Sequence, residues 1–474
     1  MYRRNPPRGA RASSAVLAAV LSACGGGSSS SLPPPPPPAY TPPGPQTSSL
    51  LAAPPVPVAG LTAVHLGTFS VNQSATFQVP ANTASVTIVQ QQAVPKGAQT
   101  IQIEGTTVPN TVFPHSISVN GQQIFDVYAD AINPGTPTGL QVYYFTDAAW
   151  AGAMTIPNTA PMLQSVLSSG GVPSGTWKLV VSDFANECPG IQACTTVYAY
   201  PASAYDITVL LKAAASPAAP ISASGKVDLA FYLLTEEWDG QPDPAAAAKA
   251  ALAPMLSSFG SIYASAGISL GNVNVYNLPA SVKAKFNGAV NADDSSPSGD
   301  LAQLLTNALP GNQMNLFLVD RIPSSSNPSG TTTVGLDGTI PGPATFGGTV
   351  QSGAIVSVVD LAAAPSRVAY IAAHETGHFL GLYHTTEADG TWFDPLTGTP
   401  QCPCSSCRPA GAAQACQNSS NSVSAPYAMT GYDCTRSASC GGGDHLMFWV
   451  ISSQSAGTIS ADEGQVMRAN PLVY

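Results

Sequence analysis

The chain has 474 residues, enough for two domains of ordinary size together with further segments. Its formal net charge is −10 and only 9% of its residues are charged. Because Lys and Arg cluster nowhere beyond the N-terminus, a nucleic-acid-binding protein is not expected. No run of 18 or more apolar residues occurs, which argues against a membrane-spanning helix.

The first 24 residues have the pattern of an export signal. Four arginines precede the short apolar stretch "AVLAAVLSA" (15–23), and "LSAC" ends at Cys24. This resembles a bacterial lipoprotein signal, in which Cys24 would carry the lipid and become the mature N-terminus. The alternative is an ordinary secretory signal with a chance cysteine. We therefore expect residues 1–24 to be a signal peptide and the protein to be lipid-anchored in the bacterial cell envelope, facing the outer membrane or cell surface.

Residues 25–58 are rich in Gly, Ser and Pro, including the tract "PPPPPP". A flexible Gly/Ser run followed by a stiff proline run is typical of a tether and cannot bury a core. Contact with a membrane is thus expected through the N-terminal lipid only.

Residues 59–213 contain short alternating runs separated by Pro, Asn and Gly, which predict an all-β sandwich. The runs are "ASVTIVQ" (84–90), "LQVYYFT" (140–146), "TWKLVVSD" (176–183) and "YDITVLL" (205–211). The stretch "TIPN…GVPSGTWKLVVSD" resembles the P-domains that accompany many secreted proteases. Such a domain could assist folding, inhibit the protease or bind another molecule, and the sequence does not distinguish these roles. Residues 214–225 have the composition of a linker.

Residues 226–474 change to a mixed α and β pattern. Apolar runs predict strands at 227–234, 273–278, 314–322 and 353–361. Asp243 and Pro244 should start a long helix that Pro254 kinks and Gly267 ends. A short helix is expected at 301–309, and the capping box "SADE" (460–463) should open a last helix. We predict an α+β domain: a twisted sheet backed by two long helices.

The stretch "HETGHFLGLYH" (374–384) holds three of the six histidines of the chain. His374 and His378 are four residues apart, so on a helix they project from one face toward one ion. Gly381 can take a positive φ and turn the chain, which would bring His384 back to the same ion. Three protein ligands with a fourth position open are typical of a catalytic zinc, and Glu375 could reach a water on that zinc.

This H-E-x-x-H-x-x-G-x-x-H pattern resembles the metzincin zinc peptidases, and most closely their pappalysin-like branch. The resemblance covers 227–474 and implies a methionine turn below the zinc. We prefer Met447, in "HLMFW", with Met429 as the alternative. Some metzincins have a zinc-binding tyrosine two residues after the methionine, whereas this chain has Trp449.

The same resemblance implies further features. The segment 345–359 would hold the edge strand that lines the cleft, to which a substrate could add as an extra strand. Calcium binding is open, with Asp389 and Asp394 available in a loop. Tyr432 and His445 could help at the site, although structural roles fit them as well.

Eight cysteines remain beside Cys24, six of them between Cys402 and Cys440. An even count in an exported protein predicts disulfides, although "CPCSSC" (402–407) could instead ligate a metal.

We therefore expect a surface-tethered, zinc-dependent endopeptidase that cleaves protein or peptide substrates. Zinc would activate a water, and Glu375 would act as general base. The alternative is an adhesin or carbohydrate-binding lipoprotein whose β-sandwich is the functional part.

Overall fold

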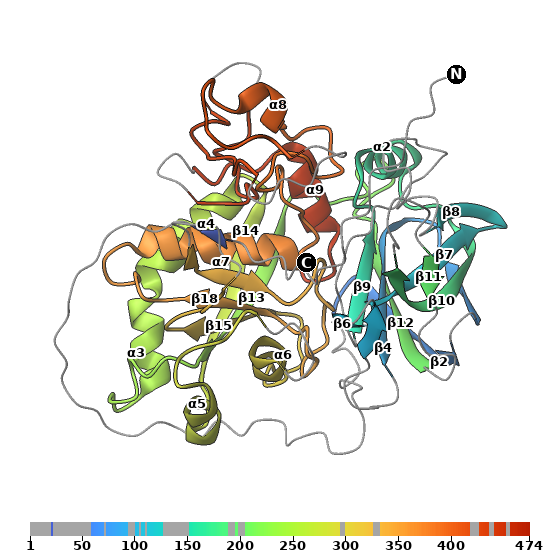
Figure 1. The fold of residues 1–474 in the computed structure, drawn as a ribbon. Helices are drawn as coiled ribbons and strands as arrows, with labels where there is room; N and C mark the ends of the chain where they lie inside the picture. Colours follow the sequence, from blue (N-terminus) through green and yellow to red (C-terminus); the bar gives the residue numbers. More distant parts are fainter. Residues whose placement is uncertain are drawn as a thin grey trace.

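The computed structural model describes residues 20–21 and 58–474, except for 71–72, 93–99, 104–105, 110, 127–150, 188–194, 198–203, 294–298, 326–331, 418–425, 436–439 and 452–455. Cys24, the tether, the run 140–146 and the pair Cys188 and Cys194 lie outside the described residues. Figure 1 shows the strands of the first half of the chain beside a second half built from helices and a sheet.

Two antiparallel sheets make up the first half. One contains β3 (Ser74–Val79), β7 (Thr111–Val119), β8 (Gln122–Asp126), β10 (Gly175–Glu187) and β11 (Thr195–Val197). The other has the order β2 (Leu61–Ser70), β12 (Ala204–Ala213), β4 (Thr83–Gln92), β9 (Ala151–Ile156). A hairpin, β5 (Thr100–Ile103) and β6 (Thr106–Pro109), and helix α2 (Ala160–Ser169) complete it. Alternate residues of both sheets, such as Phe77 and Ile88, are buried in one shared cluster.

The second half contains a five-stranded mixed sheet. Its order is β14 (Ile268–Asn277), β13 (Gly225–Leu233), β15 (Met314–Val319), β18 (Ala354–Ser357), β17 (Gly335–Asp337). The first four strands run parallel and β17 runs antiparallel to β18. The central strands are buried on both faces, as their continuous apolar sequences predict. Beside this sheet, β16 (Thr332–Thr333) pairs with β1 (Val20–Leu21).

Helices cover both faces of this sheet. On one face, α3 (Pro244–Ala251), α4 (Ala253–Ala264) and α7 (Pro365–Phe379) share a core with Leu229 and Phe231 of β13. On the other face, α5 (Ala280–Phe286) and α6 (Asp300–Leu305) share a separate core with Ala230 and Tyr232. The period of two along β13 thus divides its side chains between two cores.

The helices α8 (Cys404–Cys407) and α9 (Ala461–Ala469) follow. The capping box predicted at the start of α9 is confirmed, because Ser460 and Glu463 each accept a hydrogen bond from the other's backbone N–H. Within the described residues, none of the helices is both long and apolar enough to cross a membrane.

Two details of the sequence prediction are wrong. The long helix after Asp243 is two helices, because Pro254 at the start of α4 has no N–H to continue the hydrogen-bond ladder of α3. The segment 345–359 does not supply the edge of the sheet. Its only strand, β18, lies between β15 and β17, and the three-residue strand β17 forms the edge. The edge strand was missed because "GLD" is too short to show a pattern.

Candidate metal centre

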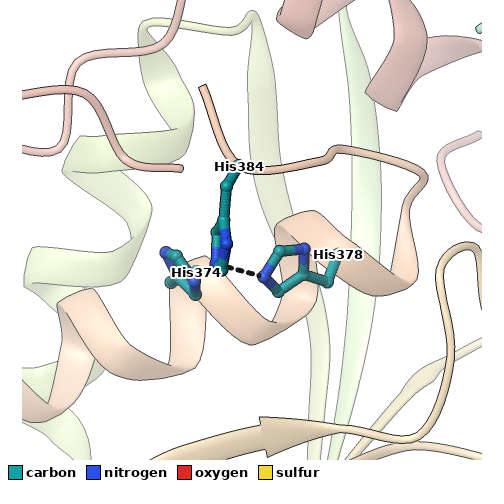
Figure 2. A group of neighbouring side chains, drawn as sticks. All are labelled: His374, His378 and His384. Carbon is teal, nitrogen blue, oxygen red and sulfur yellow. Dashed lines mark hydrogen bonds between the residues drawn. The ribbon is translucent and has the colours of Figure 1, made fainter. Parts of the chain in front are cut away.

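The three histidines of the motif converge in the structure. His374 and His378 lie one turn apart on α7, which ends at Phe379. Gly381 then takes φ +108°, as predicted, and the chain turns back. Figure 2 shows His384 reaching from this returning segment toward the two rings on the helix. All three side chains are buried, and one potential ligand atom from each lies within 4.8 Å of the others.

The Nδ1 atom of each of these three rings forms a hydrogen bond to an acceptor. His374 donates to the carbonyl oxygen of Leu446 at 2.6 Å, and His378 donates to that of Leu382 at 2.7 Å. His384 donates to Oε2 of Glu387 at 3.0 Å. Because carbonyl and carboxylate oxygens can only accept, each Nδ1 carries the proton. In the neutral ring each Nε2 therefore presents a lone pair.

These lone pairs face one another. Nε2 of His378 lies 3.2 Å from Nε2 of His384, and Nε2 of His374 is buried with no hydrogen-bond partner. Two acceptors at this distance repel each other unless a cation lies between them. Nitrogen ligands on a tetrahedral zinc, with Zn–N bonds of about 2.0–2.1 Å, are separated by roughly 3.3 Å. The donor set fits such a metal.

Burial supports the same protonation state. It lowers the pKa of His374 to about 3, helped by the charge of His384 and opposed by the Leu446 carbonyl. Burial likewise holds the pKa of His378 well below its ordinary value, with the two other histidines adding to the effect. Both rings are therefore neutral near pH 7, which is the form that binds a metal.

Glu375 lies between α7 and the edge strand β17. Its carboxylate is buried, and burial raises its pKa well above the ordinary value; the charge of nearby Asp337 adds to this, whereas the backbone N–H of Asp337 opposes it. Gly335 makes the approach possible, because a Cβ there would lie 2.3 Å from Oε1 of Glu375. Neither Gly335 nor Asp337 was predicted from the sequence, since no motif marks them.

Met447 packs against α7 at Gly377, which lies between the first two histidines in the sequence. A Cβ on Gly377, directly before His378, would lie 2.6 Å from the Met447 sulfur. Tyr370 of α7 donates its hydroxyl hydrogen bond to the carbonyls of His445 and Leu446, at 2.7 and 3.0 Å. The backbone N–H of Thr385 donates to the carbonyl of Met447 at 2.9 Å, which ties the segment of His384 to this turn. These contacts place Met447 against α7, close to the histidine motif.

The other residues named from the sequence lie elsewhere. Met429 packs among the cysteines, and its carbonyl accepts a hydrogen bond from the indole N–H of Trp449 at 2.6 Å. Nδ1 of His445 is 3.4 Å from Oε2 of Glu463, and Tyr432 is 61% exposed. His445, the one histidine among these residues, does not belong to the histidine cluster.

Six cysteines form three disulfides, Cys402–Cys434, Cys404–Cys416 and Cys407–Cys440. This excludes the alternative that "CPCSSC" binds a metal through free thiolates. We call residues 402–440 the disulfide lobe. Asp389 accepts hydrogen bonds from Thr391, and Asp394 accepts one from Thr399. Among the residues that the structure describes, the three histidines are the only group of three or more His, Cys, Asp or Glu side chains that could hold a metal ion. The prediction of calcium binding therefore has no support.

Comparison with known proteins agrees with this chemistry. Residues 232–438 match the family model Reprolysin_5, described as metallo-peptidase family M12. The match supports a metallopeptidase. It spans four of the five strands of the mixed sheet, with only the last two residues of β13, together with α7 and nearly all of the disulfide lobe, and the M12 family is zinc-dependent.

Other comparisons add little to the metallopeptidase assignment. A search among curated proteins finds no match. One matching solved structure, described as "Structure of a chaperone-substrate complex", is 11% identical, with a TM-score of 0.24. The alignment covers 60% of this chain and 41% of that one, so the chain spans less than half of its length.

Proposed function

We propose that the protein is a zinc-dependent endopeptidase of the metzincin type, with its closest affinity to the pappalysin-like branch. His374, His378 and His384 hold the zinc, Glu375 is the general base and Met447 forms the turn beneath the metal. The observation that carries this proposal is the convergence of three Nε2 lone pairs whose Nδ1 atoms are already hydrogen-bonded.

The chemistry follows from the positions of these groups. A zinc ion bound there supplies a Lewis acid that polarises the scissile carbonyl and makes water nucleophilic near neutral pH. Glu375 removes a proton from the attacking water and passes it to the departing amine. Because burial raises the pKa of Glu375, its carboxylate is a stronger base than an exposed one and can both accept and return a proton. Trp449 cannot replace the tyrosine of other metzincins, since its N–H is bonded to Met429.

We expect a substrate peptide to dock beside this centre. The strand β17 is the antiparallel edge of the sheet and lies against α7 next to Glu375. An extended peptide that pairs with β17 would be held by backbone hydrogen bonds and would lie across the cluster. Binding through backbone hydrogen bonds recognises few side chains of the substrate, so we expect a range of protein or peptide substrates.

The proposal includes the place of action. The N-terminal signal pattern and the Gly/Ser/Pro-rich segment support a protein anchored by lipid on Cys24 in the bacterial cell envelope. The peptidase would then act on proteins at the surface. The three disulfides of the lobe agree with an oxidising location outside the cytoplasm.

Zinc content and proteolysis test the proposal together. The purified protein should contain one zinc per chain and cleave casein. Glu375→Gln should keep the zinc and lower kcat at least about 10²-fold, because the ligands remain while proton transfer is lost. The measurements are metal analysis and peptide release.

Two histidine variants, one at the metal centre and one on the surface, provide a matched comparison. His374→Ala should lose both zinc and activity, whereas His65→Ala, which changes an exposed histidine paired with Asp206, should lose neither. Full turnover by Glu375→Gln would refute the assigned base. A wild-type protein without stoichiometric zinc would refute the metal centre itself.

A further inference from the structure

The third histidine is held differently from the first two. His374 and His378 donate to backbone carbonyls, but His384 donates to a side chain, the carboxylate of Glu387. His384 also lies outside the helix that fixes the other two. Its ring therefore depends on a contact that a substitution can remove.

We propose that Glu387 is a positioning residue for His384 and sets the affinity of the histidine cluster for its metal. The inference rests on the proposed zinc function. By accepting the Nδ1 hydrogen bond, Glu387 keeps the lone pair on Nε2 and fixes the plane of the ring. Its negative charge also makes Nε2 a better donor to a cation.

The backbone around Glu387 is fixed on both sides. Its N–H donates to the carbonyl of Trp392 at 3.0 Å, and its own carbonyl accepts from Gly390 at 2.8 Å. The disulfide lobe holds the neighbouring residues, since Cys402 N donates to Oγ1 of Thr386 at 3.1 Å and Met429 N donates to the carbonyl of Ala388 at 2.7 Å. The lobe thus presents the carboxylate to His384.

Burial separates this role from an ordinary surface ion pair. The side chain of His384 is 2% exposed, whereas that of Glu387 is 31% exposed. Glu387 keeps contact with water, so placing its charge there costs little. The contact is a hydrogen bond from a buried ring to a partly exposed carboxylate, and not an ion pair between two exposed side chains. Its main effect should therefore be on the metal.

Zinc affinity measured by chelator competition tests the proposal on the full chain. Glu387→Ala should bind zinc about 10–100-fold more weakly than the wild type, the range expected when such a partner of a metal ligand is removed. Glu387→Gln should lose less, because its amide oxygen still accepts the hydrogen bond. Glu236→Gln and Glu236→Ala, at an exposed glutamate after β13, serve as matched controls and should bind like the wild type.

A second measurement does not depend on the metal. In zinc-free protein with ¹⁵N-labelled histidine, the His384 signal should show the Nδ1–H tautomer, and Glu387→Ala should shift it toward the Nε2–H form. Wild-type zinc affinity in both Glu387 variants would overturn the proposal, and so would an unchanged tautomer. If the wild type itself binds no zinc, the proposed function fails instead, which keeps the two failures distinct.

Discussion

Gly335 controls how closely the edge strand approaches Glu375. A Cβ at this position would lie 2.3 Å from Oε1 of Glu375 and 2.7 Å from Cγ2 of Ile371, both on α7. Its φ is not positive, so the requirement for glycine comes from space and not from backbone conformation. The absence of one methyl group therefore allows the base to lie between the helix and β17.

The variant Gly335→Ala should retain zinc and lose at least about tenfold in kcat, because the added methyl displaces the Glu375 carboxylate. The ligands lie on other residues and should be unaffected. Gly260→Ala is the matched control: its Cβ would meet only Leu270, at 3.9 Å, within the helix α4. Equal kcat values for the two variants would contradict this account of Gly335.

At the scale of an element, α9 contacts the segment around Met447 through its first residues. Oε2 of Glu463 accepts the N–H of Ser460 at 2.6 Å and lies 3.4 Å from Nδ1 of His445. His445 comes two residues before Met447, and its carbonyl accepts the hydroxyl of Tyr370. The capping box thus has a tertiary role as well as a local one.

Ser460→Ala should lower the free energy of unfolding by about 0.5–2 kcal/mol, since the N–H of Glu463 loses its acceptor. Thermal or denaturant unfolding measures this loss. Ser257→Ala, at an exposed position inside α4, provides the comparison and should be neutral or slightly stabilising. An equal loss in the free energy of unfolding for Ser257→Ala would show that the capping hydrogen bond does not stabilise the protein.

At the scale of the whole molecule, the two halves are joined through buried polar contacts and a shared core. Lys212, at the end of β12, donates from Nζ to the carbonyls of Arg468, Asn470 and Val473. Ser85 of β4 donates to the carbonyl of Ala469 at 2.6 Å. These carbonyls belong to the C-terminal end of α9 and the residues after it, which therefore depend on the first half for their hydrogen bonds.

Lys212 should make stability depend on pH in one window. Burial lowers its pKa from 10.5 to about 7, with the charge of Arg468 adding to the effect. Between pH 7 and 10.5 the unfolded chain binds more protons than the folded one, so this group makes stability increase with pH there. Below pH 7 the lysine is charged in both states, and its contribution no longer changes.

In Lys212→Met this contribution, on the order of a few kcal/mol across the window, should disappear. Unfolding experiments at several pH values between about 7 and 10 would measure the two slopes. Lys249→Met is the control, because Lys249 is exposed. Parallel slopes for the wild type and Lys212→Met would contradict the argument.

Truncation gives a related expectation. A chain limited to residues 225–474 would leave the carbonyls at the end of α9 without their donors and would expose apolar residues of the shared cluster. We expect it to unfold at a lower temperature than the full chain, as measured by circular dichroism. A truncated chain as stable as the full protein would show that residues 225–474 fold independently of the first half.

The sequence by itself determined the local features of the site. Helix periodicity placed His374 and His378 on one face, and Gly381 predicted the turn before His384. Apolar runs located β13, β14, β15 and β18, and Ser460 located the start of α9. Each of these depends on residues within a few positions of one another, so a local pattern is enough to predict it.

Only the tertiary structure showed which distant residues meet. The edge strand β17, the hydrogen bond of His384 to Glu387 in its fixed loop, and the Lys212 contacts with the C-terminal residues have no repeating pattern in the sequence. Disulfide pairing is of the same kind, because six cysteines allow many connections and the fold selects one. The physical reason is that these contacts form only after the sheet and helices have packed, which brings together residues that lie far apart in the chain.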